Sequence, residues 1–134
     1  MKAYISVSYS GRKLTDKALI AITSTLHEFK IEPFIFVDNY NFSQAQEKQL
    51  MNQAIADIEN CDLLIAETTD KAIGVGIEAG YAKAKYKPVI YLRQKDAAHS
   101  TTLSGLSDFQ IIYEDADDLK IQLSSAIKEI LTKK

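Results

Sequence analysis

Short apolar runs and helical repeats of apolar residues alternate along nearly the whole chain. Five runs have the length and composition of strands, and they lie at residues 3–8, 34–37, 62–66, 88–92 and 109–113. Between and after them, helical spacing or helix-start signals predict helices over residues 14–30, 43–58, 74–86 and 116–131. This alternation predicts right-handed crossovers and one parallel sheet.

The fold that this pattern favours is α/β, a flavodoxin-like three-layer sandwich with a five-stranded parallel sheet in the order 2-1-3-4-5. A chain of 134 residues suffices for one domain and is too short for two separate cores, so we expect a single domain over residues 1–134. Ligands of such sheets bind at the carboxyl ends of the strands, where the strand order reverses. We therefore expect a crevice formed by the loops after strands one, three and four.

Local signals add detail at three places. Pro33 ends the first helical segment, and Ser43 with Gln46 three residues later is typical of a capping box at a helix start. The longest segment without clear periodicity is 93–108, which indicates a functional or partner-contacting loop.

Composition and charge exclude several classes of protein. The 16 basic residues against 18 acidic ones give a formal charge of −2, so a nucleic acid polymer is not an expected partner. Cys61 is the only cysteine, which favours a reducing compartment, and neither a signal peptide nor an apolar run of membrane-spanning length is present. We expect a soluble, cytoplasmic protein without a membrane partner.

The sequence offers no metal or cofactor site. Neither His27 nor His99 lies with Asp, Glu or Cys at ligand spacing, so we expect no metal and no cofactor. His27 is expected on the surface of the first helix.

The segment Gly74–Ala82, Gly-Val-Gly-Ile-Glu-Ala-Gly-Tyr-Ala, carries the sharpest chemical feature of the sequence. It lies where the loop after strand three becomes a helix. Gly74 and Gly76 let the backbone approach a ligand closely, and the helix dipole favours the ionised form of Glu78. A carboxylate kept anionic in a crevice is a suitable nucleophile for a sugar carbon. The plainer interpretation is a helix-start carboxylate on a solvated face.

A second candidate is the loop after strand one, Ser8-Tyr9-Ser10-Gly11-Arg12. Its hydroxyls, its glycine and the free amides of the following helix suit a phosphate cradle. A plain turn with capping serines accounts for the same residues equally well.

Three blocks in order, residues 4–11, 61–69 and 74–82, resemble the nucleoside 2-deoxyribosyltransferase family. Their spacing is most similar to the branch of 2'-deoxynucleoside 5'-monophosphate N-hydrolases. The resemblance implies a flavodoxin-like fold and cleavage or transfer of the N-glycosidic bond of a (deoxy)nucleoside or its 5'-monophosphate. It also implies a homodimer whose sites are completed across the interface.

The resemblance also implies roles for individual residues. Glu78 matches the family nucleophile, which would attack C1' and hold the sugar as a covalent ester until water or a second base accepts it. Tyr4 matches a tyrosine near the sugar or the nucleophile.

The phosphate or sugar pocket of the family matches Ser8 and the amides around Gly11. Ser10 stands where the family has an arginine, so Arg12 is the closest cation. Ser104 matches a phosphate-binding serine that the neighbouring subunit contributes.

One departure keeps other functions open. The family carries an aspartate on the helix before strand three, and the aligned position is Ala54. Asp57 three residues later and Asn52 two residues earlier are the candidate substitutes. The alternative is therefore a non-catalytic nucleotide-binding or sensing protein on the same fold. A third hypothesis, glycohydrolase action on a dinucleotide such as NAD, ranks last because nothing in the sequence supplies room for a second nucleotide.

Overall fold

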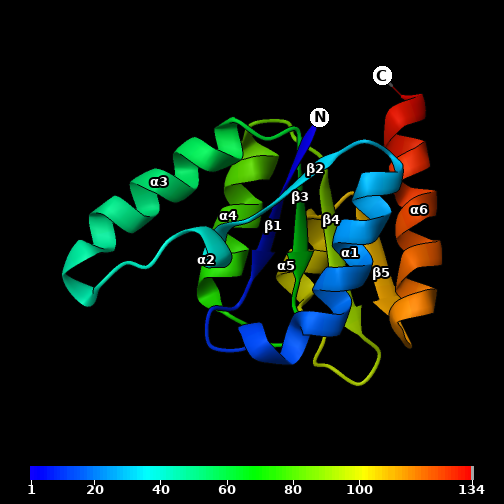
Figure 1. Ribbon diagram of the computed structural model, residues 1–134, viewed down its shortest axis with the longest axis horizontal. Coiled ribbons are helices and arrows are strands. Elements are labelled where there is room, and N and C mark those ends of the chain that lie inside the picture. The colour runs from blue at the N-terminus through cyan, green and yellow to red at the C-terminus, as the bar shows by residue number, and fades with distance from the viewer. Residues whose placement is uncertain (134) are drawn as a thin grey trace.

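Five parallel strands lie side by side in the order β2-β1-β3-β4-β5 in the computed structural model, which describes residues 1–133 (Figure 1). Every neighbouring pair is parallel. The fold class and the strand order predicted from the sequence are confirmed. The strands are β1 (Lys2–Val7), β2 (Glu32–Ile35), β3 (Leu63–Glu67), β4 (Val89–Gln94) and β5 (Phe109–Tyr113).

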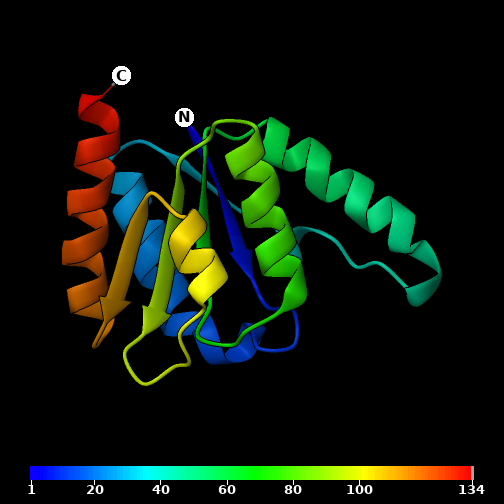
Figure 2. The same cartoon turned by 180° about the vertical axis from the view of Figure 1, so that it is seen from behind.

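Helices cover both faces of the sheet. Helices α1 and α6 lie on one face, and α3, α4 and α5 lie on the other (Figures 1 and 2). The helical elements are η1 (Arg12–Thr15), α1 (Asp16–Glu28), α2 (Phe36–Asn39), η2 (Gln44–Gln46), α3 (Glu47–Glu59), α4 (Ile73–Ala84), α5 (Thr101–Leu106) and α6 (Ala116–Thr132). None of them is long and apolar enough to cross a membrane, as far as the described residues go.

The alternation of side chains along β1 separates two cores. Ala3, Ile5 and Val7 pack under α1 and α6, whereas Tyr4 belongs to the core under α4. Because side chains of a strand alternate between the two faces, Ser6 points to the same side as Tyr4. This register directs two hydroxyl groups of β1 toward α4.

The second strand lies two residues earlier than the apolar pattern predicted. It runs over Glu32–Ile35, and the chain turns into α2 at Phe36. Pro33 therefore lies within the strand, which is tolerated because β2 is an edge strand that pairs only with β1.

Helical elements also differ from the sequence prediction. The helix expected from residue 14 begins only at Asp16, because a 3-10 turn, η1, precedes it. The segment predicted as the long loop 93–108 contains α5, whose N-cap Ser100 accepts a hydrogen bond from the Leu103 amide at 3.3 Å. A six-residue helix is too short to give a clear period.

The connection from β2 to α3 leaves the body of the molecule (Figures 1 and 2). The capping box predicted there is present, with the Ser43 amide donating to Gln46 Oε1 at 3.0 Å. Only Ala54 and Ile58 of α3 are fully buried, so the first half of this helix has little packing within the chain.

Candidate active site

The carboxylate of Glu78 points from the second turn of α4 toward β1. The Tyr4 phenol donates a hydrogen bond to Glu78 Oε2, and the Ser6 hydroxyl donates to Oε1 at 2.6 Å. Tyr4 and Ser6 are two residues apart on one face of β1, so one carboxylate can bridge both hydroxyls. The structure thus brings together the predicted residues Glu78 and Tyr4, and adds Ser6, which the sequence analysis did not single out.

Burial raises the pKa of Glu78 above its ordinary value, while the hydrogen bonds from Ser6 and Tyr4 act in the opposite direction. The sequence analysis considered only the helix dipole, which favours the ionised form of Glu78, and it did not anticipate that burial would raise the pKa of this carboxyl group. Burial, and next the negative charge of Glu78, raise the pKa of Tyr4. The phenol consequently keeps its proton and remains a donor to the carboxylate.

A cavity of about 230 Å³ lies in front of Glu78. It opens at the carboxyl edge of the sheet, near the point where the strand order reverses between β1 and β3. The lining comes from the segments after β1, β2 and β3 and from α3 and α4, and comprises Val7, Ser8, Tyr9, Phe36, Val37, Tyr40, Phe42, Leu50, Met51, Ala72, Gly74, Val75 and Glu78. The sequence analysis expected the segment after β4 to line the crevice, but no residue of that segment lines this cavity. The segment after β2, which was not expected to contribute, lines it instead.

Three aromatic residues after β2 form one wall of this cavity. The ring centroids of Phe36 and Tyr40 lie 5.0 Å apart, and those of Tyr40 and Phe42 lie 5.5 Å apart. Flat aromatic faces of this kind suit stacking with a planar ligand such as a nucleobase. The sequence analysis missed them, although the density of aromatic residues between positions 34 and 42 was a visible signal.

The serine hydroxyls of the loop after β1 contact the carboxylate of Asp70, which the sequence analysis also missed. The Ser8 hydroxyl donates to Asp70 Oδ2 at 2.7 Å, and the Gly11 amide donates to Ser8 Oγ at 3.2 Å. The Ser10 hydroxyl lies 3.1 Å from Ser8 Oγ and 3.4 Å from Asp70 Oδ2. A Cβ atom at Gly11 would lie 2.5 Å from Asp70 Oδ2, so this turn requires glycine for steric reasons.

Arg12 is held away from the loop's hydroxyls by two carboxylates. Its Nε and Nη2 atoms each lie 2.7 Å from an oxygen of Asp38, and Nη1 pairs with Asp16. Asp38 thus serves as an ion-pair partner for Arg12.

Asp57 lies on α3 behind the aromatic wall and does not line the cavity. Its Oδ1 accepts a hydrogen bond from Gln53 Nε2 at 3.0 Å, whereas its Oδ2 is buried without a partner. Burial, together with this carboxylate, raises the pKa of Tyr40. Ala54, which the resemblance aligns with an aspartate of the family, is buried in the core.

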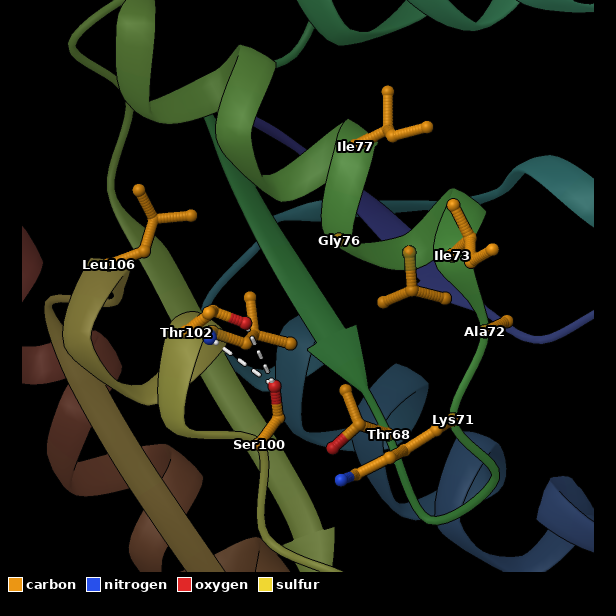
Figure 3. A pocket seen from close by; sticks show the side chains of 11 residues that line it. Thr68, Lys71, Ala72, Ile73, Gly76, Ile77, Ser100, Thr102 and Leu106 are labelled. Atoms are coloured by element: carbon orange, nitrogen blue, oxygen red, sulfur yellow. Dashed lines mark hydrogen bonds between the residues drawn. The ribbon is translucent and has the colours of Figure 1, made fainter.

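A second cavity, of about 650 Å³, lies between α4 and α5. Figure 3 shows Thr68, Lys71 and Ser100 at one end, with Ile77 and Leu106 toward the other. It is lined by residues of the segment after β3, of α4, and of α5 with its N-cap.

The two glycines of the motif therefore face different spaces. Gly74 lines the cavity of Glu78, and Gly76 lines the larger one between α4 and α5. A Cβ atom at either glycine would meet nothing within 4 Å, so both backbone segments border open space. Ser104, on α5, lines neither cavity, and its amide donates to the Ser100 carbonyl at 2.9 Å.

Glu67 is a second buried carboxylate, on the opposite face of the sheet. It is 0% exposed and accepts hydrogen bonds from the Tyr113 phenol and, at 2.6 Å, from the Thr69 amide. Burial, and next the charge of Glu67, raise the pKa of Tyr113. These bonds fix the start of the loop that leads from β3 to Asp70.

Across residues 1–133, no three His, Cys, Asp or Glu side chains come together as metal ligands would.

A comparison against known families identifies the family of the chain. Residues 3–123 match the family described as nucleoside 2-deoxyribosyltransferase, and the chain belongs to that family. A comparison with curated protein sequences finds no match.

Several solved structures are similar in fold. The CMP N-glycosidase BcmB of Clostridium botulinum superposes with a TM-score of 0.69 at 24% identity, covering 94% of this chain and 99% of its own. A 2-deoxyribosyltransferase of Bacillus psychrosaccharolyticus gives a TM-score of 0.69 at 17% identity over 90% of each chain. A conserved protein of Enterococcus faecalis V583 gives 0.71 at 15% identity, over 94% of this chain and 98% of its own.

Proposed function

We propose that this protein cleaves or transfers the N-glycosidic bond of a nucleoside or nucleoside 5'-monophosphate, with Glu78 as the nucleophile. The observation that carries the proposal is the inward-facing carboxylate of Glu78, which is held by Tyr4 and Ser6 and lines a cavity with an aromatic wall. The cavity lies at the edge where sheets of this topology bind their ligands. Membership of the nucleoside 2-deoxyribosyltransferase family supports the same chemistry.

In the proposed reaction, a Glu78 oxygen attacks C1' of the sugar as the C1'–N bond breaks. The base leaves with the bonding electron pair and takes up a proton from water. A water molecule or a second base then attacks C1', loses a proton and releases the Glu78 carboxylate. Tyr4 and Ser6 orient the carboxylate, and their hydrogen bonds offset part of the effect of burial on its pKa.

Other residues around the cavity and on α5 take supporting roles in this proposal. Phe36, Tyr40 and Phe42 provide the surface on which the base stacks. Asp57 is a positioning residue behind Tyr40, because its carboxyl group does not line the cavity. Ser104 lines neither cavity within one chain. In this proposal it contributes to a site only in a homodimer, where it would contact the substrate bound by the neighbouring subunit.

Base release from a panel of ribonucleosides, 2'-deoxyribonucleosides and their 5'-monophosphates, followed by chromatography, tests the proposal. We expect the wild type to release base and Glu78→Gln to be slower by about 1,000-fold or more, because the amide keeps the shape but is no nucleophile. Glu28→Gln, an equivalent change at an exposed position at the end of α1, is the matched control and should leave the rate unchanged.

The alternative is a non-catalytic nucleotide-binding protein. Its support is that Ala54 replaces the family's aspartate and that Glu78 is the one acidic residue among those lining the cavity. Stabilisation of the wild type by nucleotides in a thermal-shift assay, with no base release, would establish this alternative. Equal rates for the wild type and Glu78→Gln would remove Glu78 from the mechanism.

A further inference from the structure

Two segments that line the cavity of Glu78 are no longer held together by strand pairing where they form it. β2 pairs with β1 only as far as Ile35, which lies opposite Ile5, whereas β1 continues to Val7. Beyond these points, the loop after β1 contributes residues 7–9 to the lining, and the segment after β2 contributes residues from 36 to 42. The sheet therefore does not by itself set the distance between these two sides of the cavity.

Apolar packing holds the first residue of the aromatic wall more firmly than the other two. Phe36 is 7% exposed, and its ring centroid lies 5.9 Å from that of Tyr4. Tyr40 and Phe42 are only partly buried where they pack against the same core. The first half of α3, which follows them, has little packing within the chain. The outer part of the wall therefore gains more from any further contact with the body of the molecule.

An ion pair between Arg12 and Asp38 provides such a contact. Arg12 follows the loop after β1, and its Nε and Nη2 atoms each lie 2.7 Å from an oxygen of Asp38 on α2. Within residues 1–133, no other hydrogen bond or ion pair joins residues 36–43 to residues 8–15. The pair is partly exposed, but its bidentate geometry is the one in which ion pairs at a surface stabilise most.

Asp16 holds the same guanidinium group through its third nitrogen. Nη1 of Arg12 pairs with this carboxylate, which lies at the start of α1. The hydrogen bonds with Asp38 raise the pKa of Arg12 more than the hydrogen bond with Asp16 does, so Asp38 is the stronger partner. Arg12 is not among the residues that line the cavity. Its effect on the site therefore passes through Asp38.

We propose that Arg12 is a positioning residue that acts through Asp38 and holds the aromatic wall where a base can stack while its sugar lies against Glu78. This inference rests on the proposed function, because it concerns binding of the substrate in the same cavity. A wall that is held in place before the substrate arrives binds the base without the cost of ordering the segment. The ion pair does not touch the reacting atoms, so it affects KM more than kcat.

Two single variants and their combination test this role, with a nucleoside that the wild type cleaves as the substrate. Arg12→Gln and Asp38→Asn each break the ion pair with little change of shape, and each should raise KM by about fivefold while kcat changes by less than about twofold. The double variant should be no worse than either single variant, because both changes remove one contact. Asp16→Asn removes only the other partner of Arg12 and is the matched control, with a KM within about twofold of the wild type.

Direct contact between Arg12 and the phosphate of a 5'-monophosphate would give a different pattern. Arg12→Gln would then raise KM for monophosphates alone. Asp38→Asn would leave KM unchanged or lower it, because it frees the guanidinium group. This pattern overturns the inference, which predicts similar increases in KM for a nucleoside and for its monophosphate in both variants.

A merely structural role of the ion pair gives a third pattern. Loss of folded protein lowers the apparent kcat and leaves KM as it is, and this result also overturns the inference. Urea denaturation of each variant measures the fraction that is folded under the assay conditions. If Arg12→Gln does not fold, Asp38→Asn breaks the same pair from α2 and carries the test.

Failure of the inference and failure of the proposed function give different results. Base release that depends on Glu78, with an unchanged KM in Arg12→Gln and Asp38→Asn, leaves the proposed function standing and overturns the role of Arg12. The absence of base release from every compound overturns the proposed function, and the inference with it.

Discussion

The chemistry proposed for this protein depends on the environment of one side chain, Glu78. Desolvation raises its pKa, and hydrogen bonds from Ser6 and Tyr4 lower it, with burial the larger effect. A carboxyl group in this position is reactive only when ionised, so kcat/KM should rise with pH through a pKa above the ordinary value of glutamate. Because the folded state binds this proton more tightly than the unfolded chain, the same shift makes stability fall as the pH rises through that range.

Removing one hydrogen bond should move this titration in a known direction. Ser6→Ala removes a bond that favours the ionised form, so we expect the Glu78 pKa to rise further. Titration of the labelled Glu78 carboxyl carbon by NMR measures the shift, and the acidic limb of the pH–rate profile should move upward with it. Ser24→Ala, on α1, is the control and should leave the titration as it is. A Glu78 pKa in the Ser6→Ala variant that is equal to or below the Glu78 pKa in the wild type would contradict the account.

At the residue scale, sequence reasoning identified the groups that belong to a contiguous motif. Glu78 and Gly74 lie close together in the chain, and both line the cavity. Asp70 was missed because its significance comes from a contact with Ser8, 62 positions away in the sequence. The ion pairs of Arg12 with Asp16 and Asp38 were missed for the same reason. The composition of a loop does not reveal which charged residues will be neighbours in the folded chain.

At the scale of elements, the end of α4 stores backbone strain away from the site. Tyr86 has φ of 60° and is 96% exposed, and the amides of Tyr86 and Lys87 bond back to the carbonyls of Lys83 and Ala82 at 3.0 Å. This is the position at which helices ordinarily carry glycine. Tyr86→Gly should therefore raise the free energy of unfolding by about 0.5 to 1 kcal/mol.

Urea denaturation measures this change. Lys85→Gly, one residue earlier with φ of −93°, relieves no strain and should lower the free energy of unfolding. Destabilisation by Tyr86→Gly of the same size as by Lys85→Gly would contradict the strain argument.

The predicted elements were correct where the apolar pattern was uninterrupted, and they were displaced or missed where a proline or a very short length obscured that pattern. The strand Phe109–Tyr113 was predicted with its observed bounds, and the last helix within one residue at its end. The second strand was displaced because Pro33 normally signals a break, and only the edge position of β2 makes it acceptable. Helix α5 escaped prediction because six residues give too few repeats.

At the scale of the whole molecule, the strand order determines where the site lies. The order 2-1-3 places β1 beside β3, so α4, which follows β3, brings Glu78 over the side chains of β1. This part of the site was predictable, because alternating strands and helices at this length favour one topology. The aromatic wall was not, because it depends on the path of the chain from β2 to α3.

The central claim is that the Glu78 carboxylate attacks the sugar, and detection of the ester tests it most directly. Intact-mass spectrometry of acid-quenched wild-type protein, sampled during turnover of a nucleoside that it cleaves, should reveal a single added sugar. Peptide mapping should place that sugar on Glu78, and Glu78→Gln should carry none. Base release by the wild type without any adduct, at a rate that Glu78→Gln retains, would contradict the account.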